Sequence, residues 1–376
     1  MNKYEEIDTS TYHSELMAKT DRVRAMLTEG LELPEAEIFC SKPINYRMRA
    51  EFNIFRDGPN IRYFMVEKDG KEKKRVFITK FAPASKLINY FMPILANYIS
   101  CNSVLAEKLF DIDFLTTLSG ESLITLTYHK KLDESWTQEA RNLLSVLRQD
   151  GHTVNLIGRS HKQKILLDCD YVWEKLEVNG KTYHYQQVDN SFTQPNAGIS
   201  AQMLAYVQNN TKDLGGDLLE LYCGNGNFSI ALSQNFNQVL ATEISKSSVN
   251  SAQLNIEANK VNNLKILRLS AEEFTSAING EREFNRLKQA NVDLKSYKCE
   301  TILVDPPRAG LDDGTCKMIS AYRNIIYVSC NPETLKTNLN FLTQTHKVTK
   351  LAFFDQFPYT PHVETVVLLS REKQNG

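Results

Sequence analysis

One cysteine of the chain stands where a predicted strand ends and a predicted helix begins. The segment Tyr327–Thr334 reads Tyr-Val-Ser-Cys-Asn-Pro-Glu-Thr, in which Asn331 is a good helix N-cap and Pro332 suits the first helical position. Cys330 would then lie at a helix N-terminus, whose partial positive charge favours a thiolate. We therefore interpret Cys330 as a nucleophile, with a buried structural cysteine as the alternative.

Two carboxylates stand near other predicted strand ends. Glu364 opens the last apolar strand, where it could act as a general base, although a capping or solvated glutamate is the alternative. Asp305 begins the sequence Asp-Pro-Pro-Arg at a strand end, the place where ligands bind in parallel sheets; a proline-stiffened loop is the alternative. Amine N-methylases usually carry an aromatic residue after the two prolines. Arg308 stands there in this chain, which disfavours N-methylation.

A glycine-rich turn indicates a cofactor site. The sequence Glu-Leu-Tyr-Cys-Gly-Asn-Gly-Asn-Phe, residues 220–228, predicts a strand, a turn and a helix start, and Gly224 would let the backbone approach a ligand closely. Ser229 replaces the third glycine of a dinucleotide fingerprint, so S-adenosylmethionine fits better. Glu243 ends the next strand, where it could accept both ribose hydroxyls. A tight turn beside a surface glutamate is the alternative.

The elements that must position these residues alternate after residue 180. Short apolar strands near residues 218–222, 238–243, 264–269, 300–305 and 324–329 are separated by helical segments, which predicts a doubly wound, mostly parallel sheet. Residues 348–354 and 364–370 have no helix between them. They predict an antiparallel hairpin at the sheet edge, and the expected class is an α/β, Rossmann-like methyltransferase domain over residues 181–376.

The first half of the chain has a different pattern. Residues 45–81 predict an antiparallel meander, and helices over 84–100 and 135–148 with further strands complete an α+β domain over residues 1–180. Residues 42–86 carry twelve basic and five acidic side chains, whereas the whole chain has a net charge of −1. A basic stretch of this kind can bind a polyanion, although a solvated charged surface is an equal alternative.

The composition excludes several classes of protein. The chain of 376 residues has no apolar run long enough to span a membrane and no signal peptide at its start. Its seven cysteines include no C-x-x-C pair, which argues against a disulfide framework, a structural zinc site and an iron–sulfur cluster. We therefore expect a cytoplasmic protein without a metal.

Taken together, the motifs resemble those of the bacterial tRNA (uracil-5-)-methyltransferase family, within the RNA 5-methyluridine methyltransferase superfamily. The stretches that carry the resemblance begin at residues 46, 128, 192, 220, 241, 295, 327 and 361. The resemblance implies that Cys330 is the nucleophile and Glu364 the base. It also implies that the residues contacting S-adenosylmethionine are Gln194, Tyr222, Asn227, Glu243 and Asp305.

The resemblance further implies the reaction and the partner. The expected product is 5-methyluridine at uridine 54 of the tRNA T loop, formed through a covalent bond between Cys330 and carbon 6 of uracil. The first domain would hold the T arm, and we expect Arg47, Arg49, Phe110 and His129 to contact RNA. Arg308 replaces the second cysteine of cytosine methylases, which favours uracil. Alternatives are another uridine in ribosomal RNA or tmRNA, a cytosine, and an RNA-folding protein.

Overall fold

The computed structural model describes residues 3–69, 72–290 and 292–371. The chain forms two compact units. Unit 1 comprises Met1–Ser10, Lys42–Lys175 and Gln187–Ala197, and unit 2 comprises Thr11–Ser41, Leu176–Gln186 and Gly198–Gly376. The sequence predicted two domains that meet at one boundary, residue 180. The two units differ from this prediction because Thr11–Ser41, near the N-terminus, belongs to unit 2.

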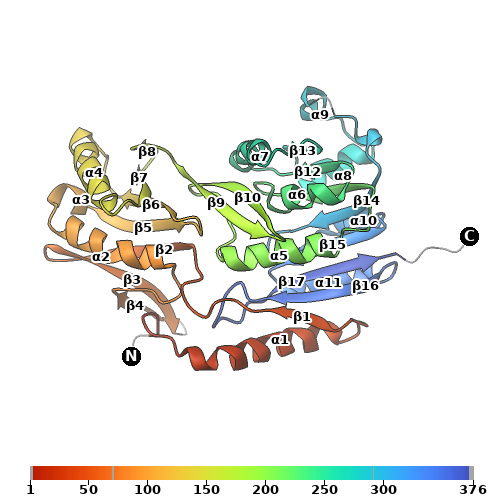
Figure 1. Ribbon diagram of the computed structural model, residues 1–376, viewed down its shortest axis with the longest axis horizontal. Coiled ribbons are helices and arrows are strands. Elements are labelled where there is room, and N and C mark those ends of the chain that lie inside the picture. The colour runs from red at the N-terminus through yellow and green to blue at the C-terminus, as the bar shows by residue number, and fades with distance from the viewer. Residues whose placement is uncertain (1–2, 70–71, 291, 372–376) are drawn as a thin grey trace, which may run out of the picture. The chain divides into compact units, whose positions relative to one another are not determined.

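Unit 2 is built on an eight-stranded sheet in the order β1-β16-β17-β15-β14-β11-β12-β13 (Figure 1). All neighbouring strands are parallel except β17, which runs antiparallel to both β15 and β16. The strands are β1 Ala36–Phe39, β11 Asp217–Leu221, β12 Val239–Thr242, β13 Leu264–Leu267, β14 Cys299–Val304, β15 Asn324–Ser329, β16 Lys347–Phe354 and β17 Glu364–Ser370. The predicted α/β class with a mostly parallel sheet is confirmed for this unit.

The predicted place of the hairpin at the sheet edge is wrong. Strands β16 and β17 do form an antiparallel hairpin, but β1 pairs in parallel with β16 and takes the edge position. Strand β1 comes from the N-terminal part of the chain, and it satisfies the outer backbone groups of β16 that would otherwise lack partners. A four-residue strand of the sequence Ala-Glu-Ile-Phe gives too short a pattern to predict this pairing.

The helices of unit 2 connect and cover its strands. Helices α1, α11, α10 and α8 contact one another in that order, and their apolar side chains share one core with the sheet. Helices α7 and α11 begin at the side-chain caps Ser245 and Asn331. The helices are α1 Tyr12–Thr28, α5 Ala197–Asn209, α6 Asn227–Leu232, α7 Lys246–Ala258, α8 Ala271–Ile278, α9 Asn285–Gln289, α10 Asp313–Ile319 and α11 Pro332–Leu342.

Unit 1 contains a seven-stranded sheet in the order β4-β3-β2-β5-β6-β7-β8. Its neighbours are antiparallel except β6 and β7, which helix α4 connects. Helices α2 and α4 pack on one face of the sheet, around the buried Phe91 and Trp136. The elements are β2 Arg49–Asp57, β3 Asn60–Asp69, β4 Glu72–Ile78, α2 Lys86–Ser100, α3 Ser103–Ala106, β5 Leu109–Thr116, β6 Glu121–Tyr128, α4 Glu134–Leu147, β7 Thr153–Ser160 and β8 Gln163–Leu166.

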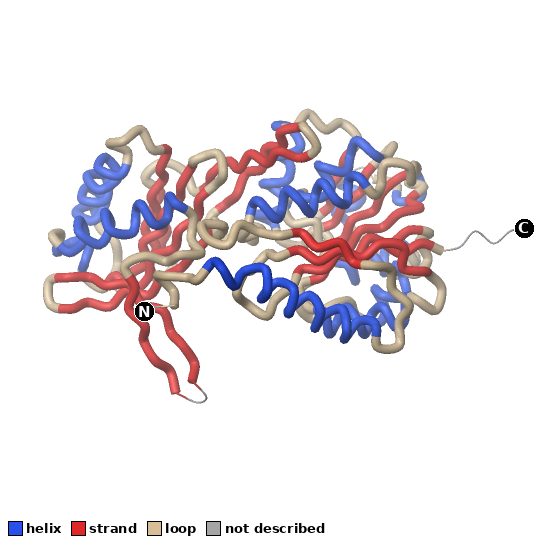
Figure 2. The backbone as a smooth tube through the Cα atoms, turned by 60° about the horizontal axis from the view of Figure 1, so that its bottom comes forward, coloured by secondary structure: helices blue, strands red, loops and turns tan. Residues whose placement is uncertain are grey.

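Two features complete the fold. Strands β9 (Tyr171–Val178) and β10 (Lys181–Val188) form a two-stranded ribbon whose residues belong partly to unit 1 and partly to unit 2. The β3–β4 hairpin extends beyond the rest of the unit 1 sheet (Figure 2). Within the described ranges, no helix is both long and apolar enough to cross a membrane.

Candidate active site

The glycine-rich turn after β11 has a backbone that most residues avoid. Tyr222, Gly224 and Gly226 adopt φ values of 61°, 56° and 83°, and Gly226 N–H closes the turn on the carbonyl of Cys223 at 2.9 Å. Helix α6 begins directly afterwards at Asn227. Glycine tolerates such φ angles without strain, which explains its use at two of the three positions.

Glu243 lies against this turn. It follows β12, and its two carboxylate oxygens accept the backbone N–H groups of Gly224 at 3.0 Å and of Ser245 at 2.7 Å. Each oxygen keeps a lone pair for a further donor, such as a ribose hydroxyl. Asn227 Nδ2 lies 3.5 Å from Ser200 Oγ, within the same unit. The structure therefore brings together the turn and the acidic residue that the sequence placed nineteen positions apart.

The turn has room for a ligand. A β-carbon added to Gly224 would meet no other atom within 4 Å, so the space above the backbone is open. A nucleoside cofactor can approach such a backbone closely, and Glu243 offers the acceptors for its ribose. These observations fit S-adenosylmethionine. Tyr222, Asn227 and Asp305 lie in unit 2 with the turn, whereas Gln194 belongs to unit 1.

Cys330 and Glu364 are brought together by the register of the sheet. Ser329, the last residue of β15, pairs with Thr365 of β17, so continuing the antiparallel register by one residue places Cys330 opposite Glu364. On its other side Glu364 pairs with Phe354 of β16. Glu364 is only 5% exposed, and Cys330 is partly exposed. A thiol and a buried carboxyl group thus meet at one end of the sheet.

The protonation of this centre is governed by burial. Burial raises the pKa of Glu364 to about 8, with a smaller contribution from the negative charge of Asp305. Burial likewise raises the pKa of the partly exposed Asp305 to about 7. The pKa of Cys330 is raised to about 11 by burial and by these two carboxyl groups, while Arg308 acts weakly in the opposite direction.

The sequence-based expectation of a depressed thiol pKa is therefore wrong. Cys330 does precede the cap residue Asn331, as predicted, and helix α11 starts at Pro332. Desolvation and two neighbouring carboxyl groups outweigh the partial charge of the helix terminus, which falls off within its first turn. The thiol must therefore lose its proton during the reaction.

The loop that carries Cys330 is fixed by its neighbours. Ser329 Oγ donates to the carbonyl of Asn331 at 3.0 Å, and Asn331 Nδ2 donates to the carbonyl of Arg308 at 3.0 Å. Thr334 Oγ1 contacts the same carbonyl at 3.4 Å. The segment after β14 and the segment after β15 therefore hold each other, and Cys330 is positioned by backbone contacts on both.

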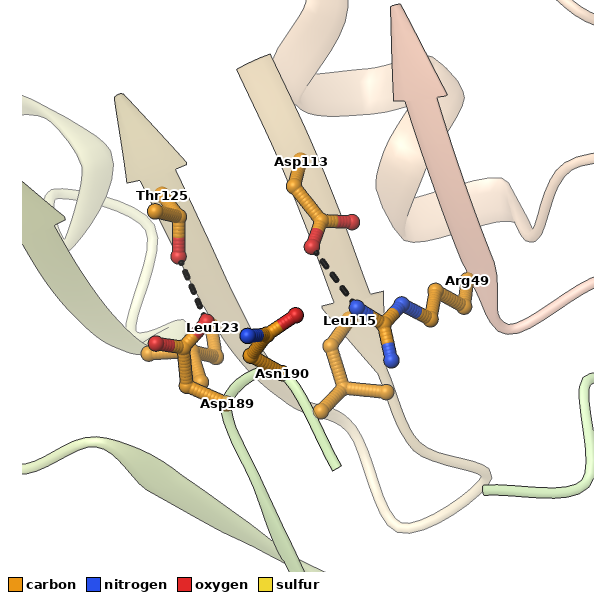
Figure 3. A pocket seen from close by; sticks show the side chains of 7 residues that line it. All are labelled: Arg49, Asp113, Leu115, Leu123, Thr125, Asp189 and Asn190. Carbon is orange, nitrogen blue, oxygen red and sulfur yellow. Dashed lines mark hydrogen bonds and ion pairs between the residues drawn. The ribbon is translucent and has the colours of Figure 1, made fainter. Parts of the chain in front are cut away.

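In unit 1, the two arginines chosen from the sequence make internal contacts. Arg49 donates through Nη2 to Asp113 Oδ2 at 3.0 Å and through Nη1 to the carbonyl of Ser191 at 2.9 Å, and Figure 3 shows its guanidinium turned toward Asp113. Arg47 Nε donates to the carbonyl of Arg49 at 2.8 Å, and burial lowers the pKa of Arg47. Their contact with RNA stays a prediction.

Phe110 and His129 lie together on unit 1, as a stacked pair. Their ring centroids are 3.8 Å apart and their planes are 13° from parallel. They line a cavity of about 810 Å³ whose other lining residues include Lys130, Lys131 and Lys162. Flat rings beside several cations are what a single-stranded nucleic acid requires, because bases stack and phosphates attract positive charge.

The residues that hold the end of β16 were not identified from the sequence. Tyr12 and Lys19, both on α1, form hydrogen bonds with Asp355 at the start of the connector between β16 and β17. A lysine on an amphipathic helix has the same sequence pattern as a solvated charge, so no signal distinguishes it.

Among the residues that the structure describes, no group of three histidine, cysteine or acidic side chains is arranged to hold a metal ion.

Comparison with solved structures finds a protein of similar fold. The fold is similar to that of Pyrococcus abyssi tRNA (uracil-54, C5)-methyltransferase, solved in complex with S-adenosyl-L-homocysteine, with a TM-score of 0.68 over 95% of this chain and 83% of that chain. The identity is 21%, so this similarity concerns the fold. The class of fold is therefore the α/β fold of this solved protein, with the glycine-rich turn after β11.

Sequence comparison gives the family. Residues 11–372 match the family described as tRNA (Uracil-5-)-methyltransferase. The tRNA/tmRNA (uracil-C(5))-methyltransferase of Vibrio atlanticus is 54% identical over 98% of this chain and 99% of its own length, and that of Vibrio cholerae is 52% identical over similar shares. The chain belongs to the tRNA (uracil-5-)-methyltransferase family.

Proposed function

We propose that the protein methylates carbon 5 of uridine 54 in the T loop of tRNA, and of the corresponding uridine in tmRNA. The relatives of similar length are named for action on both RNAs, which supports this range of substrates. The observation that carries the proposal is the register that places Cys330 opposite Glu364 at the end of β15 and β17. A nucleophile and a base that stand opposite each other on neighbouring strand ends can act on adjacent carbons of one pyrimidine ring.

The chemistry requires a nucleophile because carbon 5 of uracil is unreactive. When the Cys330 sulfur forms a bond to carbon 6, electrons move toward carbon 5, which becomes enolate-like. Bound S-adenosylmethionine supplies the methyl group. Carbon 5 then bears both a methyl group and a hydrogen, so a base must remove that proton. As Glu364 takes it, the carbon 5–carbon 6 double bond re-forms and the bond to the Cys330 sulfur breaks.

The pKa values determine which groups carry a proton before the reaction begins. Near neutral pH Cys330 is a thiol, because burial and the nearby carboxyl groups raise its pKa to about 11. Its proton must pass to a base as the sulfur attacks, and the carboxylate of Asp305, with a pKa of about 7, can accept it, which leaves Glu364 free for the carbon 5 proton. Glu364, with a pKa near 8, is well matched to both accepting and releasing a proton at physiological pH.

The cofactor and the RNA would contact different residues in this proposal. Glu243 would accept the ribose hydroxyls of the cofactor, and Gly224 would let the backbone approach it, with Gln194, Tyr222, Asn227 and Asp305 as further contacts. Phe110 and His129 would stack on bases of an opened loop, because a uridine must leave its stack to react. All seven cysteines are free thiols, which fits an enzyme of the reducing cytoplasm.

The proposed substrate is tested with an RNA hairpin that has the sequence of the T arm. Purified protein with S-adenosylmethionine labelled on its methyl group should transfer label to a hairpin carrying uridine 54, and not to a hairpin with cytidine at that position. A fragment of ribosomal RNA containing a methylatable uridine serves as the control. Label on the ribosomal fragment alone would contradict the proposed substrate, and absence of any transfer would favour an RNA-folding role.

A further inference from the structure

The connector between β16 and β17, residues 355–363, leads directly into Glu364 and is held by helix α1. Lys19 of α1 is only 8% exposed. Its Nζ donates to Asp355 Oδ1 at 2.6 Å and to the carbonyl oxygens of Phe357 at 3.0 Å and Thr360 at 3.3 Å. One ammonium group therefore holds three points of a nine-residue connector.

Two further side chains of α1 contact the same connector. Tyr12 donates its hydroxyl to Asp355 Oδ2 at 2.7 Å, and its ring meets that of Tyr359 edge-on with centroids 5.9 Å apart. Arg22 donates to the carbonyl of Pro361. The contacts from α1 are thus spread from the first residue of the connector to a residue three positions before Glu364.

The register of β16 and β17 places the residues that α1 contacts close to Glu364. Asp355 follows Phe354, the residue of β16 that pairs with Glu364. The connector is therefore fixed at both of its ends close to the proposed base. Cys330 has a separate support, through Ser329, Asn331 and the carbonyl of Arg308. A change in α1 should consequently affect Glu364 more than Cys330.

A gain in stability does not by itself explain why Lys19 and Asp355 form a buried ion pair. The side chain of Asp355 is 0% exposed and that of Lys19 is 8% exposed, so both charges have lost most of their contact with water. A buried pair of this kind is often no more stabilising than apolar side chains of similar volume, because desolvation offsets the attraction. What the pair does provide is direction, since its hydrogen bonds fix one geometry of the connector.

We propose that Lys19, together with Tyr12, is a positioning residue for Glu364, and that it serves the proton-removal step rather than the attack by Cys330. This inference rests on the proposed function, in which Glu364 takes the proton from carbon 5. A base displaced by a fraction of an ångström still permits formation of the adduct and methyl transfer. It slows only the step in which the carbon 5 proton leaves and the sulfur is released.

The test uses the full-length protein with Lys19→Met and Asp355→Asn combined, because removing both charges leaves no unpaired buried ion. With a T-arm hairpin and labelled S-adenosylmethionine, we expect the covalent complex to form at the wild-type rate. Its release should slow by about 10- to 100-fold, the scale of a small misplacement of a catalytic group. A labelled protein–RNA band should therefore accumulate on a denaturing gel. Arg24→Met, which removes an exposed cation from the same helix, should behave as wild type.

The outcomes separate this inference from the proposed function. Release at the wild-type rate, or equal slowing of adduct formation and release, would overturn the positioning role. Glu364→Gln is measured in parallel: if it accumulates the adduct and the double variant does not, only the positioning role is wrong. If Glu364→Gln accumulates none, the assignment of the base is wrong and the inference falls with it.

Folding of the double variant is checked by circular dichroism and by calorimetric binding of S-adenosylmethionine. Should the double variant not fold, Tyr12→Phe takes its place, since it removes one hydroxyl and leaves the ion pair intact. We expect slower release from Tyr12→Phe with unchanged adduct formation. Wild-type release from folded Tyr12→Phe would then overturn the inference.

Discussion

The end of the unit 2 sheet that carries Cys330 and Glu364 and the sheet of unit 1 differ in what places their side chains. In unit 2, backbone pairing decides the geometry: the register of β15 and β17 sets Cys330 against Glu364. In unit 1, side-chain contacts decide it, as in the Phe110–His129 stack and the Arg49–Asp113 pair. Positions set by strand ends can be predicted from sequence, whereas positions set by competing side-chain partners cannot.

The largest effect should follow from Cys330→Ala. Without the sulfur no bond to carbon 6 can form, and carbon 5 stays unreactive. We expect neither a covalent complex nor methylated RNA, while the affinity for S-adenosylmethionine measured by calorimetry stays unchanged. Cys223→Ala, at the buried cysteine of the turn, is the matched control and should still form the covalent complex. Methyl transfer by Cys330→Ala would show that Cys330 is not the nucleophile.

Glu243→Ala should weaken cofactor binding strongly. The substitution removes acceptors for the ribose and also frees the N–H groups of Gly224 and Ser245. Loss of hydrogen bonds to a charged group costs about 1.5–3 kcal/mol, which is roughly 10- to 150-fold in dissociation constant. Calorimetry with S-adenosyl-L-homocysteine measures this change. An unchanged dissociation constant would show that Glu243 only closes the turn.

Residues placed by strand ends could be predicted from the sequence, whereas contacts between distant segments could not. Cys330, Glu364, Glu243 and Gly224 each stand at a junction of strand and loop, and short apolar strands are visible in the sequence. The pairing of β1 with β16 and the contacts of Lys19 join segments more than 300 residues apart, and no local pattern reports them. The thiol pKa was mispredicted because the sequence shows the helix start but does not show how deeply Cys330 is buried.

Phe110→Ala should reduce RNA affinity without changing cofactor affinity. Stacking of a base on an aromatic ring contributes about 1–3 kcal/mol, so the dissociation constant of a T-arm hairpin should rise roughly 5- to 150-fold. Filter binding at constant ionic strength measures the change. Tyr90→Ala, at another partly exposed aromatic residue of unit 1, serves as the control. Equal RNA affinity in Phe110→Ala would place the base contacts elsewhere.

Arg49→Ala should have the smallest effect on RNA binding and a clear effect on stability. The guanidinium partners Asp113, whose pKa burial raises to about 6 and Arg49 lowers in part. Removing it leaves a partly buried carboxyl group with fewer partners, at a cost of about 1–3 kcal/mol and a fall in Tm of several degrees. Differential scanning calorimetry measures the Tm. Because Arg49 is also an expected phosphate contact, the salt dependence of RNA binding should become flatter. An unchanged Tm would contradict the stabilising role of the pair with Asp113, and an unaltered salt dependence would place the RNA on another surface.

In the proposed mechanism Cys330 and Glu364 act in successive steps on one uracil ring, and a denaturing gel tests this order most directly. Glu364→Gln is incubated with a T-arm hairpin and S-adenosylmethionine labelled on the methyl group. Because the amide cannot take the carbon 5 proton, the methylated RNA should stay bonded to Cys330 and run as a slow, labelled band. Adding Cys330→Ala to this variant should abolish the band. Turnover of Glu364→Gln at the wild-type rate with no accumulated band would contradict the claim.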